Sequence, residues 1–264
     1  MLTCKFFKRN TFYRIKNLMR KNIRIYVDQK IEEGIILLNK KTSHYLKNVM
    51  RLNERDNINI FNEIDGEWLV EINSFKKSET EVLIKKFIKP SCEFFDVSLL
   101  FAPIKQARLD YFAQKTCEMG VKTLWPIYTE YTQSKKFNSK RFKANLIEAA
   151  EQCDFNNIPE IREPENFKNI LTNWDNLLGD NQVIFCDEKS TINAFDLLQN
   201  HKYEGKKWSI IIGPEGGFSE KERELINKKN NSLNISLGPR VLRSDTALVS
   251  VLSIFQSIIG DWKN

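Results

Sequence analysis

The sequence lacks any apolar run of about 18 residues, the length at which a helix begins to span a bilayer. We therefore expect no membrane-embedded segment. It has only two histidines, and its five cysteines form no C-x-x-C pair and have no histidine at metal-ligand spacing. An odd number of cysteines argues against a closed disulfide framework. We predict free thiols, a cytoplasmic location and no metal site; the cysteines are Cys4, Cys92, Cys117, Cys153 and Cys186.

Acidic residues are absent from the first 27 positions, which hold eight basic side chains with aromatic ones interleaved. This segment could be an organellar transit peptide, a basic arm that binds RNA, or an extension upstream of a true start at Met19. Serine is not enriched, which argues against a transit peptide. Met19 stands just before the first strand-like segment, so we favour the third interpretation and treat residues 1–22 as a basic N-terminal extension.

The chain is long enough for two domains, and its charge favours a polyanionic partner. Its 264 residues exceed one typical domain, so we expect an α/β core with a smaller companion. The net charge of +7 suits a nucleic acid, because each Lys or Arg that neutralises a phosphate releases a counterion. Charge alone does not distinguish RNA from DNA.

Residues 23–89 have the pattern of a small β-barrel. One helical piece over residues 42–50 interrupts the strands, with Thr42 or Ser43 as its cap and Tyr45, Leu46 and Val49 on its apolar side. The segment 89–93 contains a proline and predicts a linker. The strand-like segments are IRIYV at 23–27, IILL at 35–38, INIF at 58–61, EWLVEI at 67–72 and TEVLIKKFI at 80–88.

From residue 94 onward, strands alternate with helices, which predicts βαβ crossovers and a mostly parallel sheet. Ligand sites of such sheets lie beyond the carboxyl ends of the strands. This rule selects the loops after Cys186, Ile212 and Leu237. The strands are expected at 97–102, 123–128, 182–186 and 208–212, and the helices at 105–119, 139–153, 192–199, from Ser219, and at 244–260.

The segment GPEGGFS at 213–219 is the strongest chemical signal. It follows an apolar strand and precedes a helix that Ser219 and Glu222 would start as a capping box. The glycines predict a tight loop whose backbone approaches a ligand or another chain. It matches neither the P-loop nor the G-x-G-x-x-G pattern. A purely structural turn would explain the glycines but not the carboxylate of Glu215 between them.

A second loop, LGPRVLRSDTA at 237–247, carries two arginines at the start of the last helix. Ser244 or Asp245 can cap that helix, and capping is the more common role for such an aspartate. Arg243 gains nothing from the helix dipole at this end, so we infer a bound anion or an acidic partner for it.

Together these two segments resemble the signature of SPOUT-class methyltransferases, and specifically the bacterial 16S ribosomal RNA uridine-N3 methyltransferases. The resemblance continues through HYLKNVMRL at 44–52, LLFAPIKQARLDYFAQKTCEMGV at 99–121, EAAEQC at 148–153 and IPEI at 158–161. It implies a PUA-like RNA-binding barrel over 23–89. It further implies a SPOUT α/β domain over 94–264 with a deep trefoil knot.

The same resemblance implies methylation of N3 of one uridine in 16S ribosomal RNA of the assembled 30S subunit, by a homodimer that contacts through its last helix. The implied cofactor is S-adenosylmethionine, held by three loops. The implied cofactor-binding residues are Phe185, Cys186, Asp187, Glu188, Gly213, Pro214, Glu215, Gly216, Gly217, Leu237, Gly238, Arg240, Val241 and Leu242.

Methyl transfer to uracil N3 requires that its weakly acidic proton leave. A carboxylate with an ordinary pKa of about 4 is a poor base for that proton unless burial raises it. A guanidinium could instead stabilise the developing uracil anion. We assign Arg243 as anion stabiliser and Glu215 or Asp245 as candidate base. Candidate RNA contacts, each of which could equally be a solvated basic residue, are His44, Lys47, Arg51, Lys105 and Arg108.

The chain departs from the family pattern at three places. Tyr131 follows Glu130, and Asp154-Phe155-Asn156 follows EQC, where the family commonly has arginine; Asp245 replaces the usual glutamate. These changes affect substrate contacts more than the Gly-Pro loops. Two rival functions therefore stay open. One is a related SPOUT enzyme that acts on another RNA position, such as a ribose 2′-hydroxyl, and the other is a non-catalytic RNA-binding ribosome-assembly factor.

Overall fold

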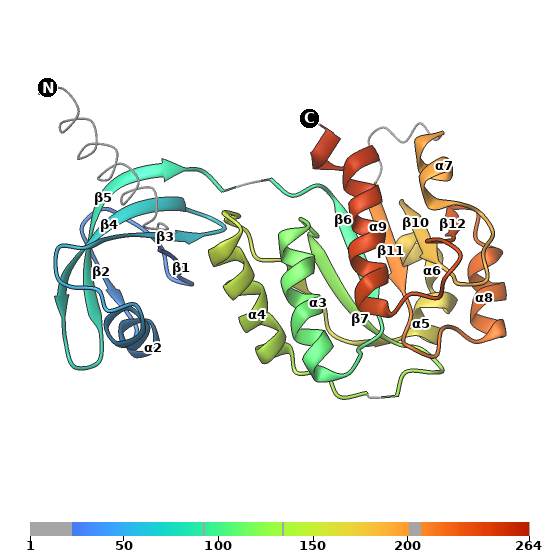
Figure 1. Cartoon of the computed structure of the whole chain (residues 1–264), viewed down its shortest axis with the longest axis horizontal. Helices are drawn as coiled ribbons and strands as arrows, with labels where there is room; N and C mark the ends of the chain where they lie inside the picture. Colours follow the sequence, from blue (N-terminus) through green and yellow to red (C-terminus); the bar gives the residue numbers. More distant parts are fainter. Residues whose placement is uncertain (1–22, 92, 134, 201–206, 264) are drawn as a thin grey trace, which may run out of the picture. The chain divides into compact units, whose positions relative to one another are not determined.

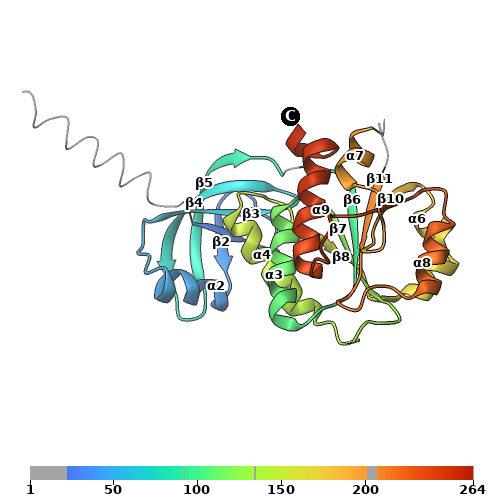
Figure 2. The same cartoon turned by 45° about the vertical axis from the view of Figure 1, so that its right-hand side comes forward.

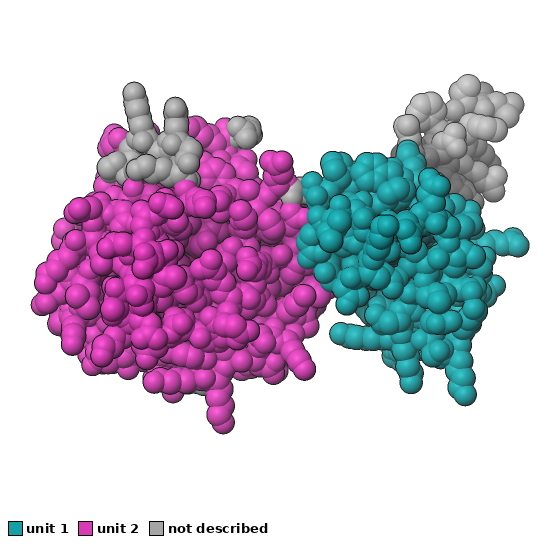
Figure 3. Space-filling model, turned by 180° about the vertical axis from the view of Figure 1, so that it is seen from behind, with its two compact units in different colours: residues 1–92 teal, residues 93–264 magenta. Residues whose placement is uncertain are grey.

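A computed structural model describes residues 23–91, 93–133, 135–200 and 207–263. The expected basic extension over residues 1–22 lies outside the described residues. The chain divides into two compact units, Met1–Cys92 and Glu93–Asn264, which Figure 3 distinguishes by colour. No helix in the described part of the chain is long and apolar enough to cross a membrane.

The first unit is a five-stranded sheet that contains all five predicted strands. Its order is β1-β3-β4-β5-β2; β1 pairs with β3 in parallel and the other pairs are antiparallel. Register shifts between β4 and β5 mark bulges, which bend a sheet and increase its twist. Figure 1 shows the strong curvature of these strands. The strands are β1 (Arg24–Tyr26), β2 (Ile35–Leu38), β3 (Asn57–Asn62), β4 (Gly66–Phe75) and β5 (Thr80–Lys89).

A buried ion pair lies between β1 and β4. The guanidinium of Arg24 donates to both carboxylate oxygens of Glu67, from Nε at 3.1 Å and from Nη2 at 3.0 Å. Asn59 on the intervening strand donates to the same carboxylate at 2.6 Å, and Arg24 lies 4.3 Å from the ring centre of Phe61. These contacts satisfy two charges that would otherwise be costly to bury.

The predicted helix over 42–50 is present, but its cap was assigned to the wrong residue. Helix α2 (Lys40–His44) begins after Asn39, whose side chain accepts a hydrogen bond from the amide of Thr42 at 3.0 Å. The hydroxyl of Ser43 is turned inward and donates to the carbonyls of Leu38 and Asn39. An asparagine placed three residues earlier therefore performs the capping that the threonine and serine were expected to perform.

The second half of this helix is a π-helix, η1 (Tyr45–Val49), which changes the side chains that face the core. Leu46 is fully buried as expected, whereas Val49 is 58% exposed and does not belong to the apolar stripe. The prediction for Val49 assumed 3.6 residues per turn. The i→i+5 bond from the amide of Met50 to the carbonyl of Tyr45 widens the turn and rotates Val49 outward.

The second unit contains a sheet in which every pair is parallel, as predicted. Its order is β12-β10-β11-β6-β7-β8, and β9 pairs separately with β7. The strands are β6 (Val97–Phe101), β7 (Thr123–Tyr128), β8 (Glu160–Ile161), β9 (Glu165–Asn166), β10 (Asn181–Cys186), β11 (Lys207–Ile212) and β12 (Ser232–Ile235).

Helices cover both faces of this sheet, as expected for parallel strands that are buried on both sides (Figures 1 and 2). Helices α3 (Gln106–Glu118), α4 (Ser139–Gln152), α7 (Ala194–Gln199) and α9 (Ser244–Ile258) lie on one face. The opposite face carries α5 (Phe167–Thr172), α6 (Trp174–Leu178) and α8 (Glu220–Asn227). A short 3₁₀-helix, η2 (Asp261–Lys263), follows α9.

The predicted helices of this unit are all present, while α5 and α6 were not predicted. Each spans fewer than two turns, too few for a 3.6-residue period to be recognised. Their apolar residues are nevertheless in the core, with Phe167, Ile170 and Trp174 buried against the sheet. Gly120 adopts a φ of +71° just after α3, a left-handed conformation that favours glycine and ends the helix.

The last helix carries an apolar stripe along its inner side. Leu248, Val251, Leu252 and Phe255 are fully buried, and Ile259 is half-buried just beyond the last turn. The ring of Phe255 contacts Phe95 and Trp208 edge to face, at centroid distances of 5.6 and 5.4 Å. This helix therefore anchors the C-terminus on the sheet.

Replacing Phe255 by alanine should lower the free energy of unfolding by about 3–5 kcal/mol, because it leaves a cavity between α9 and β11. Denaturant unfolding followed by circular dichroism measures the change. The exposed Ser257 on the same helix provides the control, since Ser257→Ala should alter stability by no more than about 0.5 kcal/mol. Equal effects of the two substitutions would contradict the packing described here.

Candidate functional site

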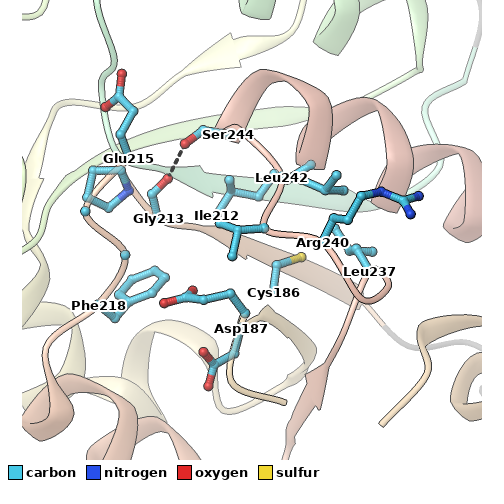
Figure 4. A pocket seen from close by; sticks show the side chains of 16 residues that line it. Cys186, Asp187, Ile212, Gly213, Glu215, Phe218, Leu237, Arg240, Leu242 and Ser244 are labelled. Atoms are coloured by element: carbon cyan, nitrogen blue, oxygen red, sulfur yellow. Dashed lines mark hydrogen bonds between the residues drawn. The ribbon is translucent and has the colours of Figure 1, made fainter. Parts of the chain in front are cut away.

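A cavity of about 260 Å³ lies where the carboxyl ends of β10, β11 and β12 meet the start of α9 (Figure 4). The three loops selected from the sheet rule form its walls. Its size is near the lower end for small-molecule sites. The lining residues are Cys186, Asp187, Glu188, Ile212, Gly213, Pro214, Glu215, Gly216, Gly217, Phe218, Leu237, Arg240, Val241, Leu242, Ser244 and Ala247.

Most of the residues expected to hold a cofactor line this cavity, and two do not. Phe185 is fully buried beneath it, with its ring 4.9 Å from that of Phe218. Phe185 is the second-last residue of β10, and its side chain packs in the core on the face covered by α5, α6 and α8. Gly238 has a φ of +118° and is not one of the residues that line the cavity.

Four lining residues were not predicted: Ile212, Phe218, Ser244 and Ala247. Ser244 is the most informative, because its hydroxyl donates to the carbonyl of Gly213 at 2.8 Å and ties α9 to the glycine loop (Figure 4). The N-cap position of α9 is Arg243, and no side chain caps the helix, so both sequence-based options, Ser244 and Asp245, were wrong. The bond from Ser244 to Gly213 joins two motifs that are far apart in the sequence, so only the tertiary structure could reveal it.

The glycine loop is held by its own backbone and by the capping box predicted from the sequence. Gly217 has a φ of +69°, and its amide donates to the carbonyl of Pro214 at 2.9 Å. The carboxylate of Glu222 accepts from the amide of Ser219 at 2.9 Å, and the Ser219 hydroxyl accepts from the amide of Glu222 at 3.4 Å. Glu222 also accepts from the amide of Glu130 at 3.0 Å and so joins the loop after β7 to this site.

A buried arginine that the sequence did not reveal joins two walls of the cavity. Arg223 on α8 forms ion pairs with Asp187 and Glu188, the two residues that follow β10. Its Nε also donates to the carbonyl of Phe218 at 3.1 Å. A methyl group on Gly217 would lie 2.8 Å from the Glu188 carboxylate and 3.2 Å from this guanidinium. Glycine is therefore required at 217 by space as well as by φ.

The three candidate catalytic residues occupy different places. Glu215 lines the cavity, and its carboxylate accepts a hydrogen bond from Arg108 at 2.7 Å. This ion pair occupies the carboxylate that would have to accept a proton if Glu215 were the base. Arg243 is exposed at the N-cap position of α9 and lies beside the cavity, but it is not part of its lining. Asp245 is half-buried in the first turn of α9 and accepts from the amide of Thr246 at 3.1 Å.

Cys186 lines the cavity as a neutral thiol. Burial raises its pKa to about 12, so it stays protonated at physiological pH. Only a thiolate is a good nucleophile. The chemistry of this cavity therefore depends on positioning and on the neighbouring polar groups rather than on covalent catalysis by Cys186.

The residues expected to contact RNA lie in both units. In the first unit, His44, Lys47 and Arg51 are exposed, and the ammonium of Lys47 lies 5.4 Å from the ring centre of Phe75. In the second unit, Lys105 is exposed at the start of α3, whereas Arg108 is half-buried through its pair with Glu215.

Aromatic residues occupy two positions where the related sequences commonly have arginine. Tyr131 lies against the glycine loop, since a Cβ on Gly216 would be 3.2 Å from the Tyr131 Cβ. Phe155 packs edge to face on Phe94 with centroids 5.1 Å apart. Phe155 is therefore a packing residue, whereas Tyr131 is 47% exposed beside the glycine loop. The arginine that lines the cavity is Arg240.

Comparison with known families identifies the class of this fold. Residues 91–256 match the family described as "RNA methyltransferase domain", and residues 38–84 match the "RNA methyltransferase PUA domain". The chain belongs to this RNA methyltransferase family. The predicted α/β fold with an N-terminal PUA domain is thus confirmed, while the trefoil knot stays a prediction.

Relatives in this family share the length of the chain. The "Ribosomal RNA small subunit methyltransferase E" of Rickettsia conorii is 31% identical over 87% of this chain and 93% of its own length. The protein of the same name from Buchnera aphidicola (subspecies Acyrthosiphon pisum) is 32% identical over 94% of this chain and 98% of its own.

Solved structures agree with this fold. A Legionella pneumophila protein solved with the bound cofactor SAM is 28% identical, with a TM-score of 0.80, and the match covers 90% of this chain and 98% of that one. The small-subunit methyltransferase E of Neisseria gonorrhoeae, 22% identical, has the same fold with a TM-score of 0.77 over the same shares of the two chains.

Arg223→Met should lower the free energy of unfolding by about 3–5 kcal/mol, because the buried Asp187 loses its partner. Adding Asp187→Asn should recover part of the loss by removing that charge. Urea unfolding of the single and double variants measures both. Lys189→Met is the control, since Lys189 and Glu220 form an exposed pair whose loss should leave the midpoint nearly unchanged. Additive effects of the Arg223 and Asp187 substitutions would show that the two are not coupled.

Proposed function

We propose that this chain transfers a methyl group from S-adenosylmethionine to N3 of a uridine in small-subunit ribosomal RNA, the position numbered 1498 in 16S RNA. The observation that carries the proposal is the cavity built from the two Gly-Pro loops, in a chain that belongs to the RNA methyltransferase family. Similarity to proteins named small subunit methyltransferase E along nearly their whole length supports the choice of RNA.

The residues of the cavity fit this cofactor. Gly213, Gly216 and Gly217 leave backbone exposed on one wall, where hydrogen bonds to an adenine edge can form. Ile212, Leu237, Leu242 and Ala247 provide an apolar surface for a flat ring. A Cβ added at Gly213 would lie 2.6 Å from Cε2 of the Phe218 ring. A larger residue at position 213 would therefore clash, and the backbone has to form this part of the wall.

When bound, S-adenosylmethionine supplies a methyl group activated by a sulfonium, so the protein mainly has to align the acceptor nitrogen behind that methyl group. The target uracil must be turned out of its RNA helix to reach the edge of the cavity. Arg243, exposed beside the cavity, is placed where it can stabilise the negative charge that develops on uracil as N3 loses its proton.

Of the two candidate bases, the contacts favour Asp245 over Glu215. Glu215 is already paired with Arg108, whereas Asp245 accepts only from the amide of Thr246 among the described residues. Neither Asp245 nor Arg243 lines the cavity, and both stand at the start of α9 next to the lining residue Ser244.

We further propose that the enzyme is a cytoplasmic homodimer that acts on the assembled 30S subunit. Support for a dimer comes from the rim of the cavity, where Val241 is 80% exposed although it lines the site. Ile192 and Phe195, next to and on α7, are about half exposed. A second copy packed along α9 and α7 would cover such apolar side chains.

Nucleoside analysis by mass spectrometry tests the reaction. Ribosomal RNA from cells that lack the protein should lose 3-methyluridine, and purified protein with S-adenosylmethionine and 30S particles should restore it. Loss of another methylated nucleoside, such as a 2′-O-methylated one, would assign a different RNA position. No change in any nucleoside, together with retained RNA binding, would identify a non-catalytic assembly factor.

Arg243→Ala should lower kcat by roughly 10²–10³-fold, because the transition state loses a charged hydrogen-bond donor. The affinity for S-adenosylmethionine, measured by calorimetry, should stay unchanged, since Arg243 does not line the cavity. Arg243→Lys should restore part of the rate. An unchanged kcat in Arg243→Ala would remove Arg243 from the mechanism.

A further inference from the structure

The positive charge of the chain is unevenly distributed. The first 27 residues hold eight basic and no acidic side chains, which leaves 33 basic and 34 acidic residues in positions 28–264. The remainder of the chain therefore has a formal net charge of −1. An RNA-binding surface within it must come from local concentration of charge rather than from the bulk composition.

One such concentration follows β7. Positions 131–147 contain no acidic residue, and their five basic side chains are all exposed. We call this the 135–143 basic segment; it consists of Lys135, Lys136, Lys140, Arg141 and Lys143. None of the five was selected from the sequence as an RNA contact.

The basic segment is held in place by the buried ring of Phe142 and the half-buried ring of Phe137. Phe142 stacks on Phe101 with centroids 5.5 Å apart, and Phe137 packs against Phe142 at 5.1 Å. Asn138 caps α4 by accepting from the amide of Arg141 at 3.0 Å. Within α4, Lys140 and Lys143 are three residues apart and share one side of the helix, opposite the buried ring of Phe142. The charges are thus presented on a fixed framework.

Because β7, β6 and β11 pair in parallel, the loop that follows β7 leaves the sheet at the carboxyl edge where the cavity lies. Figure 1 shows this loop leading into α4. The loop that leads into it contacts the cavity wall at two points, through the bond from the Glu130 amide to Glu222 and through Tyr131 against Gly216. Arg141 joins α4 to α3 by donating from Nε to Asp110 at 2.9 Å. An extended polyanion whose nucleotide enters the cavity would therefore pass close to these lysines.

The charges of the segment are poorly compensated by the protein itself. Lys140 and Arg141 stand in the first turn of α4, where the helix dipole is also positive and no acidic residue is present. Asp110 offsets Arg141. Within the described ranges, Lys135, Lys140 and Lys143 form no ion pair. Such an arrangement is stabilised when an anion binds.

We propose that the 135–143 basic segment binds the phosphate backbone of the RNA beside the target nucleotide. The inference rests on the proposed function and deepens it by locating a substrate surface outside the cavity. RNA is favoured over a membrane surface because Phe137 and Phe142, the aromatic side chains of the segment, pack inward rather than outward. The segment supplies affinity without contributing to the chemical step.

The test is a triple variant, Lys135→Gln, Lys140→Gln and Lys143→Gln, against a matched control with Lys168→Gln, Lys207→Gln and Lys228→Gln. All six lysines are exposed, so both proteins lose the same charge, and circular dichroism checks that both fold. RNA binding is measured by fluorescence anisotropy with an RNA that contains the target uridine, across a range of salt concentrations. Methylation of 30S particles is measured in parallel.

We expect the triple variant to bind RNA roughly 10-fold or more weakly and to lose about 2–3 from the slope of log K against log salt. KM for 30S particles should rise while kcat at saturation stays unchanged, and the control should match the wild type. Unchanged affinity and slope in the triple variant, or equal weakening in both variants, would overturn the inference. Loss of binding to phosphatidylserine vesicles with unchanged RNA binding would overturn it in favour of a membrane surface.

Failure of the proposed function has a different signature. In that case the wild type would leave 3-methyluridine in 30S particles unchanged, whatever the basic segment does. The anisotropy measurement still reports whether the segment binds RNA, because it does not depend on catalysis. The two ideas can thus be rejected separately.

Discussion

The parallel direction of the strands in the second unit is the constraint on which the rest depends. Because β10, β11 and β12 run the same way, their following loops must all emerge at one edge of the sheet. Two Gly-Pro segments separated by helix α8 in the sequence are thereby brought together. The bond from Ser244 to the carbonyl of Gly213 joins them directly. The cavity is a consequence of this meeting rather than of any single motif.

The loops of the cavity are stiffened by buried polar contacts at their base. Glu222 satisfies backbone amides of two different loops, and Arg223, the next residue on α8, pairs with the two carboxylates after β10. Burying these charges is tolerated because each has a partner. The first turn of α8 therefore holds two walls of the site, the loops after β10 and β11, and ties the loop after β7 to them. A preorganised cavity of this kind suits methyl transfer, in which alignment contributes more than proton chemistry.

The exposed basic charges and the cavity lie on different elements of this protein. The cavity wall is largely backbone and apolar surface, whereas cations concentrate beside it on the framework of α4. Electrostatic attraction between lysines and phosphates does not depend on sequence, so it can hold an RNA in many positions along the surface. Contacts to a base within the narrow cavity are needed to select one nucleotide. Under the proposal made above for the basic segment, this division would let a chain whose net charge beyond residue 27 is slightly negative bind RNA.

The sequence by itself determined the alternation of strands and helices, the parallel sheet, the three loops and the capping box at Ser219, because these depend on local periodicity and local hydrogen bonds. It also identified the family through its two Gly-Pro motifs. Only the tertiary structure decided the π-helix that exposes Val49, the core position of Phe185, the pairing of Glu215 with Arg108 and the place of Arg223. Each of these depends on contacts between residues far apart in the chain, or on a departure from the ideal helical turn, and neither leaves a periodic pattern in the sequence.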